Sequence, residues 1–364
     1  MKVIVFVIPS MKTGGGNRVF FELSNCLVLK YKVIVVYPNN SLEGNNFSIN
    51  GNIDIIKIGD YSTNKLKKIY NIIRIYSYIN KNHRYDTIII SDPIICLFLD
   101  IIKNKKNVYR FIQADDYKIF DDKMLLKNSI IILLYKIICK HSYRQKINFI
   151  FNSKFVYEQF VHNSKRSDVN YAVVYPAINH TIFYDANQED IRHKKLNIGL
   201  VGRKHPLKGL QIFIDMYQKL DDNIRDKIHN IYIISHDDLS SFDIKCFTVI
   251  KPKSDLEIAD IYNKCSIFIS TSWWEGFGLP GLEAMSCGCA LITSDSGGCR
   301  EYAVNNKNAL IFTPKLVEDL ISKFTSLLEN KDLIYKLSES GKKTAQEFSW
   351  EKSALQIEKI ISNV

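Results

Sequence analysis

The feature that most constrains this chain is an alternation of short apolar runs with longer amphipathic stretches, which occurs twice along the sequence. Runs that are apolar throughout are typical of strands buried on both faces of a parallel sheet. The stretches between them repeat apolar residues at helical spacing, as expected for right-handed crossover helices. The sequence therefore predicts two doubly wound α/β folds in succession.

The two sets of segments predict two domains. A chain of 364 residues has the length of two or three domains, at roughly 100–200 residues each. We expect one domain over residues 1–180 and a second over residues 196–348, followed by a last helix over residues 350–364. The segment Pro176–Lys195 is polar and has no clear periodicity, so it is interpreted as the linker.

The expected elements follow from this periodicity. In the first domain, strands are predicted at Lys2–Ile8, Val33–Tyr37, Ile53–Ile58, Thr87–Ser91, Val108–Ile112 and Ile147–Phe151, and helices at Asn17–Lys30, Lys65–Asn82, Lys123–Tyr143 and Lys154–His162. In the second, strands are predicted at Leu196–Val201, Ile231–Ser235, Phe247–Lys251, Ser266–Ser270, Ala290–Thr293 and Leu310–Phe312, with helices near 207–219, 255–263, 281–287, 315–329 and 332–348. Two such domains are expected to face each other across a cleft at the carboxyl ends of their parallel strands, where open α/β sheets bind ligands.

The charge is unevenly distributed. Of the formal net charge of +11, residues 1–185 carry 26 Lys and Arg against 14 Asp and Glu, whereas the remainder carries 23 against 24. The basic first half predicts an anionic partner, which the charge alone leaves open between a phospholipid surface, an anionic glycan or glycolipid, and nucleic acid. No recognised nucleic-acid-binding module occurs, so nucleic acid is not expected.

The cysteines and the apolar stretches bear on location. Eight scattered cysteines, most of them in apolar runs, indicate buried thiols in a reducing cytoplasm. Cys287, Cys289 and Cys299 lack a fourth ligand at zinc-site spacing, so no zinc is expected. The N-terminus reads as a strand instead of a signal peptide. The stretch Met124–Cys139 is interrupted by two lysines and falls short of the roughly 20 residues of a spanning helix, so we expect a cytoplasmic protein that does not cross a membrane.

Three loops carry candidate binding residues. After the first strand, Gly14-Gly15-Gly16-Asn17-Arg18 leads into a helix, where backbone N–H groups can approach a phosphate; the alternative is a tight turn. After the first strand of the second domain, Arg203 and Lys208 could neutralise a diphosphate beside a helix N-terminus, or could form a solvated basic loop.

The third segment, Ser270–Ala284, is the strongest. Pro280 suits the first turn of a helix, so the preceding glycines can present backbone N–H groups to a ligand. Glu275 lies in the loop and Glu283 lies eight residues later on the helix, and carboxylates are good acceptors for sugar hydroxyls. The alternative is that Glu283 only supports the start of the helix.

These segments together resemble the family 4 retaining glycosyltransferases. The resemblance rests on Arg203 and Lys208 in Gly-Arg-x4-Lys-Gly, the Glu275-x7-Glu283 pair, the N-terminal glycines and the closing Phe348-Ser349-Trp350-Glu351-Lys352, so that it spans the chain. It implies a GT-B architecture of two Rossmann-like domains, with the acceptor bound by the first and the sugar nucleotide mainly by the second. It also implies that the last helix packs back on the first domain.

The resemblance implies a role for each matching residue. Arg203 and Lys208 would bind the donor diphosphate and act in catalysis with Glu275, and Glu283 would hydrogen-bond the ribose. Glu275 and the loop Gly276, Phe277, Gly278 and Leu279 would hold the transferred sugar, while Gly15 and Gly16 would approach the phosphates. It further implies retention of the anomeric configuration. Fixed cations and N–H dipoles would stabilise the charge that builds on the departing diphosphate.

The chain also departs from the family pattern. Where the family often has His-Asp or His-Gly, this sequence has Gln113, which cannot titrate, followed by Asp115 and Asp116, which either contact the acceptor or form a surface turn. The loop Ser235–Asp238 replaces a glycine-rich one, which leaves the base undefined. No Asp-x-Asp triplet occurs, so we expect no metal and no bound cofactor beyond the sugar nucleotide.

The basic stretch Lys123–Lys146 has two interpretations. Its lysines flank an apolar core, a pattern that is compatible with a helix at an anionic membrane surface. The alternative is a partly buried helix with a solvated basic face.

The sequence thus predicts a metal-independent retaining glycosyltransferase that moves a hexose-type sugar from a nucleoside diphosphate to a saccharide. The expected acceptor is a lipid-linked glycan of a bacterial surface polysaccharide: O-antigen, capsule or lipopolysaccharide. The competing hypotheses are an enzyme of the same scaffold with a soluble acceptor, a sugar-nucleotide epimerase, and a non-enzymatic binder of anionic polymers.

Overall fold

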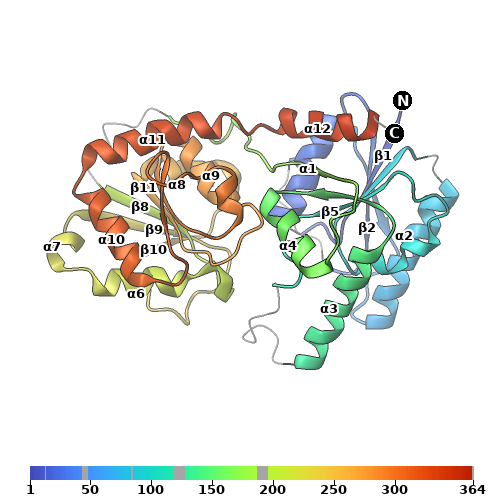
Figure 1. Ribbon diagram of the computed structural model, residues 1–364, viewed down its shortest axis with the longest axis horizontal. Helices are drawn as coiled ribbons and strands as arrows, with labels where there is room; N and C mark the ends of the chain where they lie inside the picture. The colour runs from blue at the N-terminus through green and yellow to red at the C-terminus, as the bar shows by residue number, and fades with distance from the viewer. Residues whose placement is uncertain (13, 43–47, 83–84, 119–127, 187–195, 363–364) are drawn as a thin grey trace. The chain divides into compact units, whose positions relative to one another are not determined.

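The fold is described from a computed structural model, which describes residues 1–12, 14–42, 48–82, 85–118, 128–186 and 196–362. The chain divides into two compact units. Unit 1 comprises Met1–Ala177 with Trp350–Val364, and unit 2 comprises Ile178–Ser349. Each unit is built on one parallel sheet with helices on both of its faces (Figure 1).

The sheet of unit 1 has seven parallel strands in the order β3-β2-β1-β4-β5-β6-β7. The strands are β1 (Val3–Val7), β2 (Lys32–Pro38), β3 (Asp54–Ile58), β4 (Thr87–Ile90), β5 (Val108–Ile112), β6 (Asn148–Phe151) and β7 (Tyr171–Val173). The helices are α1 (Gly15–Leu27), α2 (Lys65–Asn82), the 3₁₀ segment η1 (Ile95–Ile101), α3 (Ser129–Arg144), α4 (Lys154–Ser164) and α12 (Trp350–Ser362).

The core of unit 1 follows from the apolar runs. β1 lies between β2 and β4, where Val5 pairs with Ile34 on one side and with Ile88 on the other. Because residues of β1 are buried on both faces, an uninterrupted apolar run is the sequence that fits this position. Helix α1 packs Phe20 between the rings of Phe6 and Phe111, at centroid distances of 5.7 and 5.6 Å.

Helix α12 lies in unit 1 although it follows unit 2 in sequence. It packs on α1, and its Glu358 forms an ion pair at 3.1 Å with Lys30, three residues beyond the end of α1. The Ser353 hydroxyl donates a hydrogen bond to the Tyr175 carbonyl at 2.6 Å. The chain therefore contributes both of its ends to the same unit.

The sheet of unit 2 has six parallel strands in the order β10-β9-β8-β11-β12-β13. The strands are β8 (Leu196–Val201), β9 (Ile228–Ile234), β10 (Thr248–Ile250), β11 (Ile267–Ser270), β12 (Ala290–Ser294) and β13 (Ala309–Phe312). The helices are η2 (Pro206–Lys208), α6 (Leu210–Lys219), α7 (Asp222–Arg225), α8 (Asp255–Lys264), α9 (Leu279–Ser286), η3 (Gly298–Glu301), α10 (Val317–Leu328) and α11 (Lys331–Ala345).

The structure confirms the predicted α/β class with two doubly wound parallel sheets. It differs in the segment Pro176–Lys195, since Ile178 and Phe183 are buried in unit 2 and the Phe183 carbonyl accepts a hydrogen bond from Ser286 at 2.7 Å. Residues 187–195 of that segment lie outside the described residues. The predicted helix Lys123–Tyr143 is described from Ser129 onward.

Two further observations concern the cysteines and the membrane. All eight cysteines are free, and six of them are buried. In the ranges of the chain that the structure describes, no helix is both long enough and apolar enough to span a bilayer.

Candidate functional site

The loop after β8 carries the predicted cations. Arg203 donates from Nε to Asp237 Oδ2 at 3.1 Å, and the same oxygen accepts from the backbone N–H of Lys204 at 2.8 Å. Asp237 lies in the loop after β9, the neighbouring strand. The Arg203 guanidinium is therefore held by a carboxylate at the carboxyl edge of the sheet while its side chain stays 43% exposed.

Gly209 fixes the end of this loop. It adopts a φ of +64°, which favours glycine, and a Cβ at this position would lie 2.1 Å from the Thr271 carbonyl oxygen. The Thr271 hydroxyl donates to the Lys208 carbonyl at 3.1 Å, and Trp273 N donates to the Leu207 carbonyl at 2.7 Å. The loop after β8 is thus packed directly on the loop after β11.

This packing brings two predicted site residues into contact. Lys208 Nζ lies 2.6 Å from Glu275 Oε1, and the two side chains are 36% and 18% exposed. Together with Ser270, Gly278 and Pro280 they line a small pocket. A cation and a carboxylate thus face the same pocket, where one can bind an anion and the other can accept hydrogen bonds from hydroxyl groups.

The segment Glu275–Leu279 is held by the loop after β12. Glu275 N donates to the Ser296 carbonyl at 2.9 Å, and Gly298 N donates to the Glu275 carbonyl at 3.1 Å. A Cβ on Gly298 would lie 2.4 Å from the carbonyl carbon and oxygen of Gly276. This close backbone approach requires glycine at position 298.

Tyr302 holds the start of α9. Gly278 has a φ of +92° and caps this helix, and its carbonyl accepts a hydrogen bond from the Tyr302 hydroxyl at 2.7 Å. Burial raises the pKa of Tyr302 well above its ordinary value, and the charges of Cys299, Glu275 and Glu283 add to the effect. Glu275 and Glu283 therefore both contribute to the raised pKa of this buried hydroxyl.

The remaining predicted residues of unit 2 have distinct positions. Phe277 is buried, with its ring 5.5 Å from that of Tyr302. Glu283 is the fifth residue of α9 and is 5% exposed. The structure therefore brings Lys208 and Glu275 into direct contact and places Glu283 one turn into the helix that begins at Leu279.

In unit 1, the predicted glycines form the N-terminus of α1. A Cβ on Gly15 would meet no atom within 4 Å, and one on Gly16 would lie 3.8 Å from Gln113 Oε1. Gln113 follows β5, and its side-chain amide donates to the Gly16 carbonyl at 3.0 Å. The open space at Gly15 is the arrangement that allows a ligand to approach this helix end.

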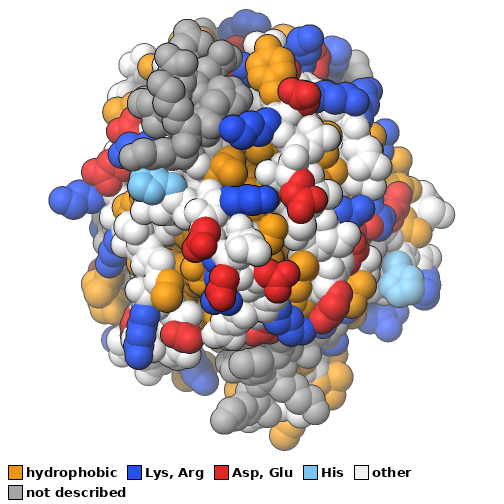
Figure 2. Space-filling model, turned by 90° about the vertical axis from the view of Figure 1, so that its left-hand side faces the viewer, with side chains coloured by type: hydrophobic (Ala, Val, Ile, Leu, Met, Phe, Trp, Pro, Cys, Tyr) orange, Lys and Arg blue, Asp and Glu red, His pale blue; other side chains and the backbone are white. Residues whose placement is uncertain are grey.

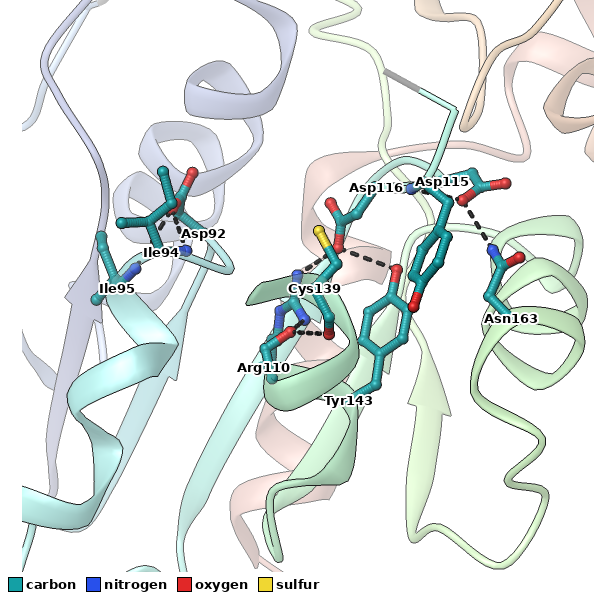
Figure 3. A network of polar contacts seen from close by, with 11 residues as sticks. Asp92, Ile94, Ile95, Arg110, Asp115, Asp116, Cys139, Tyr143 and Asn163 are labelled. Carbon is teal, nitrogen blue, oxygen red and sulfur yellow. Dashed lines mark hydrogen bonds and ion pairs between the residues drawn. The ribbon is translucent and has the colours of Figure 1, made fainter. Parts of the chain in front are cut away.

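Asp115 and Asp116 belong to a polar network around Arg110 (Figure 3). Arg110 lies on β5, is fully buried, and bonds to the Asp116 carboxylate and to the Ser142 hydroxyl. The Tyr143 hydroxyl donates to Asp116 at 3.1 Å, and Asn163 donates to Asp115 at 2.9 Å. Both carboxylates are thus buried and hydrogen-bonded within unit 1.

Charge pairing dominates this network. Burial lowers the pKa of Arg110, but the Asp116 carboxylate and weaker interactions outweigh it, so that the pKa is raised above its ordinary value. A second carboxyl, Asp92, accepts hydrogen bonds from Ile94 N and Ile95 N at 2.7 and 3.4 Å. Its pKa is raised, first by burial and then by Asp116, against the lowering effect of these N–H groups and of Arg110.

Sequence reasoning missed three positioning residues: Asp237, Gly298 and Tyr302. A signal for Gly298 was present in the sequence, because the loop Asp295-Ser296-Gly297-Gly298 places a pair of glycines shortly after a strand. Asp237 and Tyr302 carry no such signal, because each acts on a loop that is distant in sequence. In the described residues, no group of three or more His, Cys, Asp or Glu side chains could hold a metal ion.

The chain is similar to known glycosyltransferases. The family model described as "Glycosyl transferases group 1" matches residues 243–344. An uncharacterized glycosyltransferase of Methanocaldococcus jannaschii is 29% identical over 269 residues, which are 71% of this chain and 70% of that protein.

Two more distant similarities are informative. The N,N'-diacetylbacillosaminyl-diphospho-undecaprenol alpha-1,3-N-acetylgalactosaminyltransferase of Campylobacter jejuni is 26% identical over 179 residues, 46% of each chain. The crystal structure of Anabaena HepE in complex with UDP and glucose superimposes with a TM-score of 0.77 at 15% identity, covering 100% of both chains. At that identity the second similarity establishes the fold alone, which is of the GT-B type.

Proposed function

Because this chain belongs to the group 1 glycosyltransferases, we propose that it moves a sugar from a nucleoside diphosphate to a saccharide acceptor with retention of configuration. The observation that carries the proposal is the contact between Lys208 and Glu275 at 2.6 Å in one small pocket. One partner matches the charge of a diphosphate and the other matches the hydroxyl groups of a sugar.

The donor site is assigned to unit 2. Lys208 and Arg203 bind the diphosphate, and the N–H groups of Gly276–Leu279 face the sugar at the start of α9, where the helix dipole favours negative charge. Glu275 accepts hydrogen bonds from the sugar, and Glu283 accepts them from the ribose. As the diphosphate leaves, the fixed cations stabilise the charge that develops on it, and no metal is needed for that step.

The ion pair gives this site a specific property. With Glu275 bonded to Lys208, neither charge is left uncompensated in the half-buried pocket. A donor whose diphosphate takes Lys208 releases the Glu275 carboxylate at the same moment for the sugar hydroxyls. The two recognition events are thus linked through one contact.

The acceptor side is assigned to unit 1. We propose that Gln113 contacts the acceptor beside Gly15 and Gly16, and that Asp115 and Asp116 shape this edge through their bonds to Asn163 and Arg110. The acceptor proposed is a lipid-linked glycan of a bacterial surface polysaccharide. Two observations support it: the excess of Lys and Arg in residues 1–185 and the similarity to the Campylobacter jejuni enzyme that acts on a diphospho-undecaprenol substrate.

The donor assignment is tested by thermal shift. UDP, GDP, dTDP, CMP and ADP are each added with and without EDTA, and a ligand that binds only the folded state raises the unfolding temperature. We expect one diphosphate to stand out and its shift to be insensitive to EDTA. A shift that disappears with EDTA contradicts the metal-independent site, and a flat response to all five contradicts the assignment of Arg203 and Lys208.

Variants separate the two partners. Lys208→Ala is expected to weaken binding of the selected diphosphate at least tenfold, whereas Glu275→Ala is expected to abolish transfer without weakening that binding, because it removes the carboxylate that competes for Lys208. The matched control is Lys219→Ala, which breaks the ion pair to Glu318 at 2.8 Å on the same unit. Equal loss of nucleotide affinity in the Lys208 and Glu275 variants would overturn the assigned roles.

The acceptor is tested separately with the donor so identified. Transfer to a polyprenyl-diphosphate-linked sugar is compared with transfer to the same sugar as a free phosphate. The proposal expects the lipid-linked substrate to be preferred, and equal or better use of the free sugar phosphate would favour a soluble acceptor. The configuration of the product at its anomeric carbon, read by NMR, tests retention.

A further inference from the structure

Helix α3 exposes an unusually apolar surface. From Ser129 to Ile138 no residue of this helix is buried, and its buried residues (Cys139, Ser142 and Tyr143) all lie in its second half. In Figure 1 the N-terminal end of α3 points away from the sheet of unit 1. The large apolar side chains exposed along this half are Ile130 (68%), Leu133 (60%), Leu134 (55%), Ile137 (54%) and Ile131 (45%).

The second half of α3 adds positive charge to the same side. Lys140 and Arg144 follow Ile137 at spacings of three and four residues, so they continue the exposed stripe along the helix. No residue of α3 is acidic. The surface is therefore apolar at one end and basic at the other.

Helix α2 repeats this composition. It exposes Leu66 (76%), Tyr70 (60%) and Ile69 (42%), and the Arg74 guanidinium lies 5.9 Å from the centre of the Tyr70 ring. Its five charged residues, Lys65, Lys67, Lys68, Arg74 and Lys81, are all basic. Both α2 and α3 pack against η1, so they belong to one side of unit 1.

A surface of this kind fits an anionic bilayer. Apolar side chains of an amphipathic helix enter the boundary between headgroups and acyl chains, while Lys and Arg contact anionic headgroups. By contrast, the face of unit 2 shown in Figure 2 mixes Lys and Arg with Asp and Glu. Exposed apolar clusters are costly on a surface that meets only water, and α2 and α3 place theirs beside basic side chains, while the exposed Asp100 of η1 is paired with Lys105.

We propose that α2 and α3 together form a membrane-docking surface that inserts Ile130, Leu133 and Leu66 into a leaflet rich in anionic lipid. The proposal rests on the proposed function in one respect, because a lipid-linked acceptor is reached at such a surface. The occupant is the lipid surface itself, selected by the absence of acidic residues from both helices.

The test is flotation of the full chain with vesicles and without any sugar nucleotide. Vesicles of phosphatidylcholine alone are compared with vesicles in which about a third of the lipid is phosphatidylglycerol, the anionic probe. We expect strong binding to the mixed vesicles and at least tenfold weaker binding to phosphatidylcholine. Equal binding to the two compositions, or no binding to either, would overturn the proposal.

Paired variants assign the binding to this surface. Ile130→Gln/Leu133→Gln is expected to weaken vesicle binding at least tenfold, and Lys140→Glu/Arg144→Glu to do so on the anionic vesicles. The controls are Leu29→Gln/Leu256→Gln, at positions 78% and 60% exposed, and Lys336→Glu/Lys343→Glu on α11, each expected to change binding less than twofold. An equal loss in test and control variants would contradict the assignment.

Two readouts keep this result separate from that of transfer. Thermal unfolding confirms that each variant is folded, and light scattering measures its mass in solution. The proposal would be overturned if the wild type were a dimer and Ile130→Gln/Leu133→Gln were a monomer. In that case a second copy of the chain, and not lipid, would cover this surface. Because vesicle binding needs no donor, a failure here leaves the result of the thermal-shift experiment intact, and the reverse also holds.

Discussion

The hydrogen bond from Tyr302 to Gly278 offers a sharp test of how the loop Glu275–Leu279, which we propose to hold the donor, is positioned. Tyr302→Phe removes only the hydroxyl, which donates to the Gly278 carbonyl at 2.7 Å. The same carbonyl also accepts from Gly281 N at 3.2 Å, so it keeps one partner. We therefore expect a loss of about 1 kcal/mol in the free energy of unfolding, at the middle of the range for a buried hydrogen bond. In a unit of this size the loss corresponds to about 2–4 °C in unfolding temperature.

The matched control is Tyr76→Phe in unit 1. The Tyr76 hydroxyl is also buried and donates to a backbone carbonyl, that of Ile95, at 2.6 Å. Both variants are expected to lose similar stability in urea denaturation. Only Tyr302→Phe is expected to lower kcat/KM for the donor, by about fivefold if the whole 1 kcal/mol is used to position Gly276–Leu279 in the transition state.

The refuting results are specific. If kcat/KM falls equally in both variants, the effect is general and the bond does not position the loop. If Tyr302→Phe loses stability as expected but transfers the sugar at the wild-type rate, the start of α9 is held by the other contacts of Gly278 and Gly298.

Three further predictions concern backbone and charge. Gly298→Ala places a methyl group 2.4 Å from the Gly276 carbonyl. We expect it to lower the free energy of unfolding in urea by about 1–3 kcal/mol and to weaken nucleotide binding in the thermal-shift assay, and an unchanged free energy of unfolding would contradict the close approach. Arg110→Met leaves the buried Asp116 carboxylate unpaired and should cost about 3–5 kcal/mol by the same denaturation method, with a loss below about 1 kcal/mol arguing against the ion pair. Because the pKa of Asp92 is raised in the folded state, its contribution to stability is most favourable below the ordinary pKa of about 4 and is lost as the pH rises through the raised pKa. Asp92→Asn should therefore gain stability relative to the wild type as the pH rises above about 4, and a difference that stays constant with pH would refute the raised pKa.

Much of the fold could be predicted because it follows from local patterns. The bounds of β5, β8 and α2 agree with the structure residue by residue, since each is a run with one dominant periodicity. Strand β7 was missed because Tyr171–Val173 has only three residues and lies half-exposed at the edge of the sheet. The segment η1 was missed because its apolar run, Ile95–Ile101, has the composition of a buried strand.

The candidate site could be proposed from the sequence only where one short segment carries the chemistry. Arg203, Lys208, Glu275 and Glu283 stand in two short motifs, and their residue types indicate a diphosphate and a polyhydroxyl ligand. Nothing in the sequence indicates that Arg110, in the middle of a strand, is a fully buried cation. Its environment depends on Asp116 in the following loop and on Ser142 in a later helix, so it exists only in the folded chain.

Backbone contacts also join the loops of unit 2 that we propose to hold the donor. Three loops that follow β8, β11 and β12 meet at Glu275, and each junction is a backbone contact: Gly209 on Thr271, Trp273 on Leu207, and Gly298 on Gly276. Such contacts hold whichever side chains line the pocket, so the backbone positions of the loops that carry Lys208 and Glu275 are set before a ligand binds. On this proposal, donor binding rearranges the two side chains, and the charges are then in place when the diphosphate departs. On this proposal, we expect the specificity for one sugar or base to depend on the side chains that line the pocket, because the backbone contacts between the loops do not involve them.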